Sequence, residues 1–136
     1  KYAETAQAFD FITASERGFS SSVSQGGANL SGGQRQRLSI ARALAKRPEI
    51  YIFDDSLSAL DYKTDAALRR ALKKETSDAT VLIVTQRIST VMGAEEIVVL
   101  DDGRVVGIGT HKELMESCKV YNELANSQLS REELVS

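Results

Sequence analysis

The sequence predicts an α/β fold with a mostly parallel sheet, on three observations. Short apolar runs of strand length alternate with stretches of helical periodicity, the pattern of strands joined by crossover helices. The 136 residues suffice for one ordinary core, and 42% of them are apolar against 26% charged, as in folded globular chains. An Asp-Gly pair between two late apolar runs adds a hairpin at the end of this order.

The first third of the chain is predicted to contain two helices separated by a loop. Apolar residues recur at helical spacing near its start: Tyr2, Ala6, Phe9 and Ile12. They predict one helix over 2–14, followed by a Ser- and Gly-rich loop over 15–30. A second helix is predicted from an N-cap at Ser31 to Lys46, because Pro48 stops it. Its predicted apolar face consists of Leu38, Ala41, Leu44 and Ala45.

Two buried strands joined by a helix are predicted next. The strands are the apolar runs at 50–53 and 80–84, which are short and rich in β-branched or aromatic residues. Between them, residues 64–74 have helical periodicity. The inward side of this helix is predicted to be Leu68, Ala71 and Leu72, and the solvated side Arg69, Arg70, Lys73 and Lys74.

The last third predicts a hairpin and one or two closing helices. The runs 96–100 and 104–108 flank Asp102-Gly103, where both turn positions require positive φ. Helices are predicted over 111–126, and the polar tail from Gln128 is expected to be loosely held. The packed side of these helices is predicted to be Leu114, Met115, Cys118, Tyr121 and Leu124.

Composition excludes several kinds of site. One cysteine and one histidine rule out an internal disulfide, a four-cysteine zinc site and any site built on two histidines. A net charge of −2 argues against a nucleic-acid partner. No apolar run approaches the ~20 residues of a membrane helix. The basic residues Arg35, Arg37, Arg42, Lys46 and Arg47 are interpreted as a solvated helix face, Cys118 as a small core residue, and His111 as a surface residue near a helix cap.

The start of the second helix offers a place for an anion. Ser31 supplies a hydroxyl, Gly32 and Gly33 allow close approach to the backbone, and the helix terminus adds unpaired N–H groups. The longer stretch from Asn29 to Ala43, NLSGGQRQRLSIARA, resembles the signature motif of the ATP-binding cassette (ABC) family. The family's Walker B segment follows at 50–55, and its D-loop as Ser58-Ala59-Leu60-Asp61.

The resemblance implies a nucleotide-binding domain whose cofactors are ATP and Mg²⁺. It assigns 1–46 to part of the helical subdomain and 47–136 to the C-terminal part of a P-loop NTPase-like ATPase core. In the family two cassettes sandwich ATP, so Ser31, Gly32, Gly33 and Gln34 would contact ATP on the partner's P-loop. Ser58, Ala59, Leu60 and Asp61 would lie at the interface, and Asp54 would hold Mg²⁺ through water.

The sequence departs from the family pattern at three places. No P-loop motif occurs, so the chain is expected to be a truncated piece that does not hydrolyse ATP alone. Asp55 stands where the family has the glutamate that polarises the attacking water, and a carboxylate withdrawn by roughly 1 Å can cost on the order of 10²-fold in rate. Gln86 stands at the position of the switch histidine; it can donate a hydrogen bond but cannot carry a proton charge.

These departures resemble the degenerate cassette of heterodimeric exporters, which binds ATP at its own site and completes the partner's site. The loop 22–29 resembles the exporter segment that faces the transmembrane domain, which implies that the domain would lie at the cytoplasmic face of a cell membrane. A bacterial multidrug-type exporter is the favoured member. The alternatives are an active cassette of a homodimeric exporter and a nucleic-acid-associated ABC-type ATPase. The transported substrate is not readable, because its contacts belong to the membrane domain.

Overall fold

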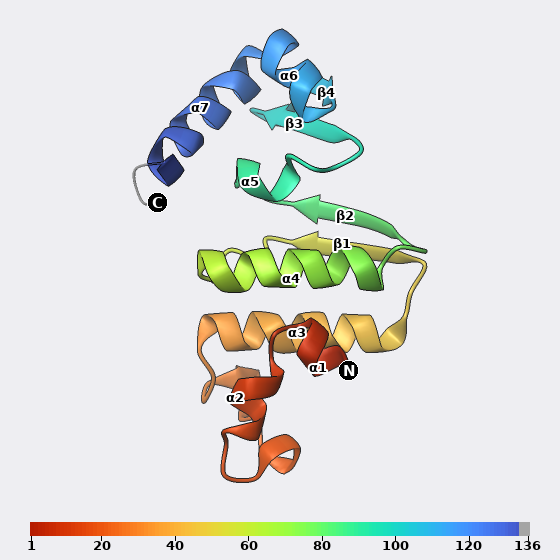
Figure 1. The fold of residues 1–136 in the computed structure, drawn as a ribbon, viewed down its shortest axis with the longest axis vertical. Helices are drawn as coiled ribbons and strands as arrows, with labels where there is room; N and C mark the ends of the chain where they lie inside the picture. Colours follow the sequence, from red (N-terminus) through yellow and green to blue (C-terminus); the bar gives the residue numbers. More distant parts are fainter. Residues whose placement is uncertain (134–136) are drawn as a thin grey trace. The chain divides into compact units, whose positions relative to one another are not determined.

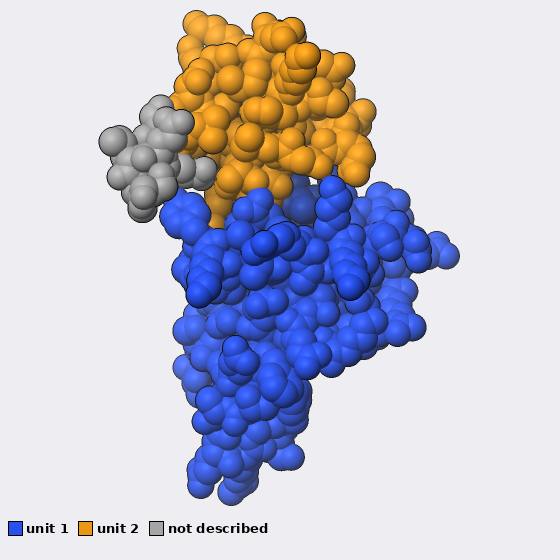
Figure 2. Space-filling view, viewed as in Figure 1, with its two compact units in different colours: residues 1–84 blue, residues 85–136 orange. Residues whose placement is uncertain are grey.

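The computed structural model describes the backbone of residues 1–133 and the side chains of residues 1–129. The chain divides into two compact units, Lys1–Val84 and Thr85–Ser136, which are coloured separately in Figure 2. The first unit contains the helices α1 (Tyr2–Thr5), α2 (Phe9–Thr13), η1 (Gly18–Ser20), η2 (Gln25–Gly27), α3 (Gly32–Lys46) and α4 (Tyr62–Glu75), and the strands β1 (Ile50–Asp54) and β2 (Thr80–Val84). The second contains α5 (Ile88–Val91), β3 (Ile97–Asp101), β4 (Arg104–Gly109), α6 (His111–Ser117) and α7 (Lys119–Glu133).

The first unit is a parallel β–α–β arrangement packed against a long helix, as predicted. β1 pairs with β2 in parallel, from Ile50 opposite Thr80 to Asp54 opposite Val84, and α4 makes the crossover. In Figure 1, α3 and α4 lie on the same side of this two-stranded sheet. Its core consists chiefly of Ile40, Leu44, Tyr51, Phe53, Leu68 and Leu72. Each large aliphatic side chain buried there contributes about 1.5–3 kcal/mol.

Neither strand is fully covered, which corrects the prediction of buried strands: β1 is buried on one face only, and β2 contains no buried residue. Tyr51 and Phe53 are buried, whereas Ile50 and Ile52 are 61% and 66% exposed. Side chains alternate across a strand, and within the first unit the helices cover one face of the sheet only. On β2, Leu82 is 53% exposed for the same reason. The length and type of these runs identified strands correctly, but the degree of burial was overestimated.

The predicted helix over 2–14 is instead two short helices separated at Gln7, whose φ is 55°. Ala6 and Ala8 on either side are fully buried. The Nη1 of Arg37 donates to the Gln7 carbonyl at 2.7 Å, and the guanidinium lies 4.9 Å from the centre of the Phe11 ring. Arg37 therefore fastens this bend to α3 and does not belong to a solvated face.

The apolar face predicted for α3 is correct except at one position. Leu44 is fully buried and Leu38 and Ala41 are half-buried, but Ala45 is exposed and Ile40 takes its place in the core. Arg35 is also more than a solvated residue, because its Nη1 donates to the carbonyls of Gly27 and Leu30 at 3.3 and 3.0 Å. These bonds tie the loop before the helix to its first turns.

The second unit is an antiparallel hairpin covered by two helices. β3 and β4 are joined by Asp102 and Gly103, with φ of 46° and 72°, as the Asp-Gly pair predicts. The core contains Ile88, Val99, Leu114, Cys118, Tyr121 and Ala125. Leu124, predicted inside, is 41% exposed, and Ala125 is fully buried instead. The prediction of a loose tail is wrong at Gln128, which lies within α7 and makes two hydrogen bonds to backbone. Residues 134–136 of the predicted tail lie outside the described part of the chain.

Candidate functional site

The first turn of α3 is closed by a capping box. The Ser31 Oγ accepts a hydrogen bond from the Gln34 N–H at 3.2 Å, and the Gln34 Oε1 accepts one from the Ser31 N–H at 2.9 Å. The Ser31 hydroxyl acts in this box only as an acceptor, so its hydrogen can still be donated. The N–H groups of Gly32 and Gly33 belong to the first turn, where a helix has no internal acceptor for them. The box thus fixes the position from which these donors point.

The glycine at 33 is favoured by the chain's own packing, because a side chain there would crowd the 58–61 segment. A Cβ on Gly33 would lie 3.0 Å from the carbonyl oxygen of Ala59 and 3.4 Å from the Leu60 Cδ2. A Cβ on Gly32 would meet only the Ala59 Cβ, at an ordinary 3.6 Å. The sequence predicted that both glycines serve close approach of a phosphate, and at Gly33 the approaching group in this chain is the 58–61 segment.

Gln36 links α3 to the turn at Asp55 and to the 58–61 segment, a contact that the sequence motif did not reveal. Its Nε2 donates to the Asp55 carbonyl at 3.2 Å and to the Ser58 Oγ at 3.1 Å. Its Oε1 accepts from the Ala59 N–H at 3.1 Å. One carboxamide therefore uses its donors and its acceptor across three groups, which holds the signature helix against 55–59.

The two carboxylates at the end of β1 are exposed. Asp54 is the last residue of the strand, and Asp55 follows it in the left-handed region with a φ of 47°. The Asp55 N–H donates to the Val84 carbonyl at 3.0 Å, so the turn is fixed to the end of β2. Both residues line a cleft of about 460 Å³, together with Gly32, Arg35, Gln36, Ser39, Ser56 and Ala59. Strand end and helix start thus border one hollow.

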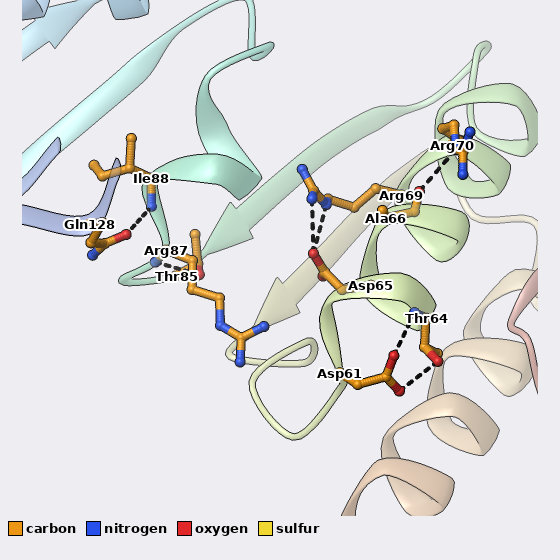
Figure 3. Close-up of polar contacts among 10 residues, drawn as sticks. All are labelled: Asp61, Thr64, Asp65, Ala66, Arg69, Arg70, Thr85, Arg87, Ile88 and Gln128. Atoms are coloured by element: carbon orange, nitrogen blue, oxygen red, sulfur yellow. Dashed lines mark hydrogen bonds and ion pairs between the residues drawn. The ribbon is translucent and has the colours of Figure 1, made fainter. Parts of the chain in front are cut away.

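Asp61 ends the 58–61 segment as the N-cap of α4 (Figure 3). Its carboxylate accepts from the Thr64 N–H at 2.9 Å and from the Thr64 hydroxyl at 2.7 Å. These bonds lower the pKa of Asp61, the backbone bond having the larger effect. The carboxylate that the sequence placed at an interface therefore also stabilises the helix behind it.

The lowered pKa of Asp61 predicts an acid-dependent contribution to stability. The folded state favours the ionised form, so this stabilisation is present above the ordinary carboxyl pKa and is lost as the pH falls through the lower folded value. Asp61→Asn keeps a capping oxygen but has no charge to titrate. Urea unfolding midpoints measured from neutral pH to below pH ~4 should therefore decline less steeply in the variant than in the parent. Equal slopes would contradict the assignment.

Gln86 lies in the second unit, in the short segment between β2 and α5. Its side chain is exposed, and its carbonyl accepts a hydrogen bond from the Gln128 Nε2 at 2.7 Å. His111 begins α6, where it was expected near a cap, but it is half-buried and its Nδ1 lies 2.8 Å from the Tyr121 hydroxyl. The buried side chain of Cys118 confirms its predicted place in the core.

Within the first unit the structure brings together Ser31–Gln34, Asp55 and the 58–61 segment, through Gln36 and Gly33. Gln86 belongs to the second unit and is described there by itself. Among residues 1–129, no three or more His, Cys, Asp or Glu side chains gather as a metal cage. No helix in the described part of the chain is long and apolar enough to cross a bilayer.

Comparisons with known proteins agree on one family. The family model described as "ABC transporter" matches residues 3–58. An uncharacterized ABC transporter ATP-binding protein of Mycobacterium tuberculosis is 52% identical over 82% of this chain and 19% of its own length. The ATP-dependent lipid A-core flippase of Photobacterium profundum is 43% identical over 94% of this chain and 22% of its own.

A solved structure of a bacterial Atm1-family ABC exporter with ATP bound is also similar. It superposes with a TM-score of 0.90 at 35% identity, over 94% of this chain and 23% of that one. The chain thus spans between 19% and 23% of the length of these three proteins. The α/β fold with a parallel sheet predicted from the sequence is confirmed by this match.

Proposed function

The chain belongs to the ABC transporter family as part of a nucleotide-binding domain, and on that premise we propose that it serves an ATP-driven exporter as the degenerate member of a cassette pair. In this proposal its signature loop completes the ATP site of a partner cassette, while its own site binds ATP more than it hydrolyses it. The observation that carries the proposal is the pair Asp55 and Gln86, which replace a glutamate and a histidine where hydrolysis needs both.

The signature loop has hydrogen-bond donors suited to binding the γ-phosphate of ATP on a partner cassette. The capping box leaves the Ser31 hydroxyl hydrogen and the N–H groups of Gly32 and Gly33 available as donors, and all of them lie at the positive end of α3, a 15-residue helix. These groups would donate to the γ-phosphate bound by the partner. Gln36 and Gly33 hold this end of the helix against 55–59, so the donors are positioned in advance.

The site on this chain's own side keeps a metal position but has a weakened base. The exposed Asp54 carboxylate at the strand end fits a Mg²⁺ ion, since that ion is usually held by one or two carboxylates together with water and substrate phosphates. Mg²⁺ would supply charge neutralisation at the phosphates. Asp55 would orient water from a shorter side chain than glutamate, and Gln86 would donate a hydrogen bond without gaining charge.

The remaining parts of the proposal follow from the family. The Photobacterium relative is named as a flippase and the solved neighbour as an exporter, and both bear on a role in membrane transport. The domain would work at the cytoplasmic face of a membrane, with the 22–29 loop toward a transmembrane domain. A net charge of −2 gives no support to a nucleic-acid role.

The test is Asp55→Asn in the full-length transporter assembled with its partner. We expect steady-state ATPase activity within about twofold of the parent, because the partner's site carries the turnover; a working catalytic base contributes ~10²–10⁴-fold. Asparagine also tolerates the left-handed backbone at this position, so the fold is retained. A loss of one hundredfold would show that this chain carries its own working site, as in a homodimeric exporter.

A further inference from the structure

The side-chain carboxamide of Gln128 makes two hydrogen bonds to the backbone of the 85–88 segment, which contains Gln86. Its Oε1 accepts from the Ile88 N–H at 2.8 Å, shown in Figure 3, and its Nε2 donates to the Gln86 carbonyl at 2.7 Å. The two bonds start from one planar group and reach backbone atoms two residues apart. They join α7 to a segment about 40 residues earlier in the chain.

The sequence places this carboxamide by helical spacing. Tyr121, Ala125 and Gln128 are spaced by four and three residues, so they share one face of α7. The first two are buried in the core of the second unit with Ile88. The apolar part of the face therefore anchors α7, and the polar residue one turn later reaches the start of α5.

Side chains satisfy three of the backbone groups that strand and helix pairing leave open around Gln86. The Gln86 carbonyl and the Ile88 N–H bind Gln128, and the Arg87 N–H donates to the Thr85 Oγ1 at 3.1 Å. The residue at the N-cap of α5, Arg87, makes no side-chain capping bond, so Gln128 supplies that function from another helix. The conformation of 85–88 is thereby set on both sides of the Gln86 side chain.

We propose that Gln128 is a positioning residue for Gln86: it fixes the backbone from which the Gln86 side chain reaches the γ-phosphate of ATP at this subunit's own site. The inference rests on the proposed function, because it takes Gln86 as a γ-phosphate donor. Without the two bonds the 85–88 segment samples more conformations, and the Gln86 amide spends less time in the one that binds phosphate.

The test uses the full-length subunit with its partner, whose own P-loop lysine is replaced so that only this subunit's site binds nucleotide. Gln128→Met keeps the length and packing of the side chain but removes both hydrogen bonds. We expect its affinity for ATP to fall about 3- to 10-fold, the equivalent of one net hydrogen bond, with affinity for ADP unchanged. Gln86→Ala should show the same selective loss, and Gln128→Met should add no more than about twofold in the double variant.

Asn122→Ala is the matched control. Asn122 is another amide on α7, and its Nδ2 donates to the Met115 carbonyl at 2.7 Å, away from Gln86. It should lower thermal stability like Gln128→Met but leave the ratio of ATP to ADP affinity intact. Equal loss of ATP and ADP binding, or an additive double variant, overturns the positioning role. If Gln86→Ala itself leaves ATP affinity unchanged, the proposed function of Gln86 is wrong and the inference fails with it; if only Gln128→Met is silent, the inference alone is wrong.

Discussion

Ser31→Arg is expected to abolish most of the ATPase activity of the assembled transporter, by ~10²–10³-fold, which is typical for losing one donor aimed at developing charge. The hydroxyl of Ser31 and the N–H groups of Gly32 and Gly33 are the donors that this chain would offer to the partner's γ-phosphate. Arginine fills the space in front of them and removes the cap that the Ser31 Oγ gives to the Gln34 N–H. The measurement is steady-state turnover at saturating ATP.

Two further substitutions separate the loss of donors from the loss of the helix cap. Ser31→Asp keeps an excellent N-cap but directs a negative charge toward the phosphate, so it should be as inactive as Ser31→Arg while melting at the parent's temperature. Ser31→Thr keeps both hydroxyl and cap and should retain most activity. If Ser31→Asp were active, the hydroxyl would serve the helix only, and the assignment of Ser31 to a partner's nucleotide would be wrong.

The second large effect is a gain. Asp55→Glu combined with Gln86→His should raise hydrolysis at this subunit's own site by up to ~10²-fold, because the base then reaches the attacking water and the switch side chain can carry charge. Each change alone should achieve much less, since groups that act as a unit are not additive. The assay is turnover of the full-length complex after the partner's catalytic glutamate is removed.

The backbone at Asp55 requires its own control in that experiment. Its φ of 47° is a conformation that aspartate adopts more readily than glutamate does. Asp55→Gln with Gln86→His carries a side chain of the same length and a similar backbone cost, but no carboxylate. This variant should stay at the parent's low rate. If it gained as much as the glutamate variant, the gain would come from the altered turn and not from a restored base.

The elements whose cause lies within a few neighbouring residues were predictable from the sequence. Ser31 is the N-cap that was predicted, where the structure adds a capping box with Gln34, and Asp102-Gly103 forms the expected turn. The break at Gln7 carries no such local signal. Its carbonyl is bound by Arg37, which is 30 residues away in the sequence.

The parts of the site that depend on distant contacts were not predictable. The motif identified Gly33 as a place for close approach, but its partner Ala59 is 26 residues further along the chain. Gln36 and Gln128 were not singled out, because their partners lie between 19 and 42 residues away and amide side chains occur on many helix surfaces. Hydrophobic periodicity also does not show whether one face or both faces of a sheet are covered by other elements. For this reason the burial of the strands at 50–53 and 80–84 was overestimated.

The three hydrogen bonds made by Gln36 limit which residues can replace it during evolution. The side chain must offer donors to a carbonyl and a hydroxyl and, from the same plane, an acceptor to an N–H group. Glutamate keeps the acceptor and loses the donors, lysine does the reverse, and asparagine is one methylene too short to span the same groups. Selection for these three hydrogen bonds alone would therefore keep glutamine at this position. Retention of Gln36 would then reflect the contact between α3 and residues 55–59, and not contact with a nucleotide.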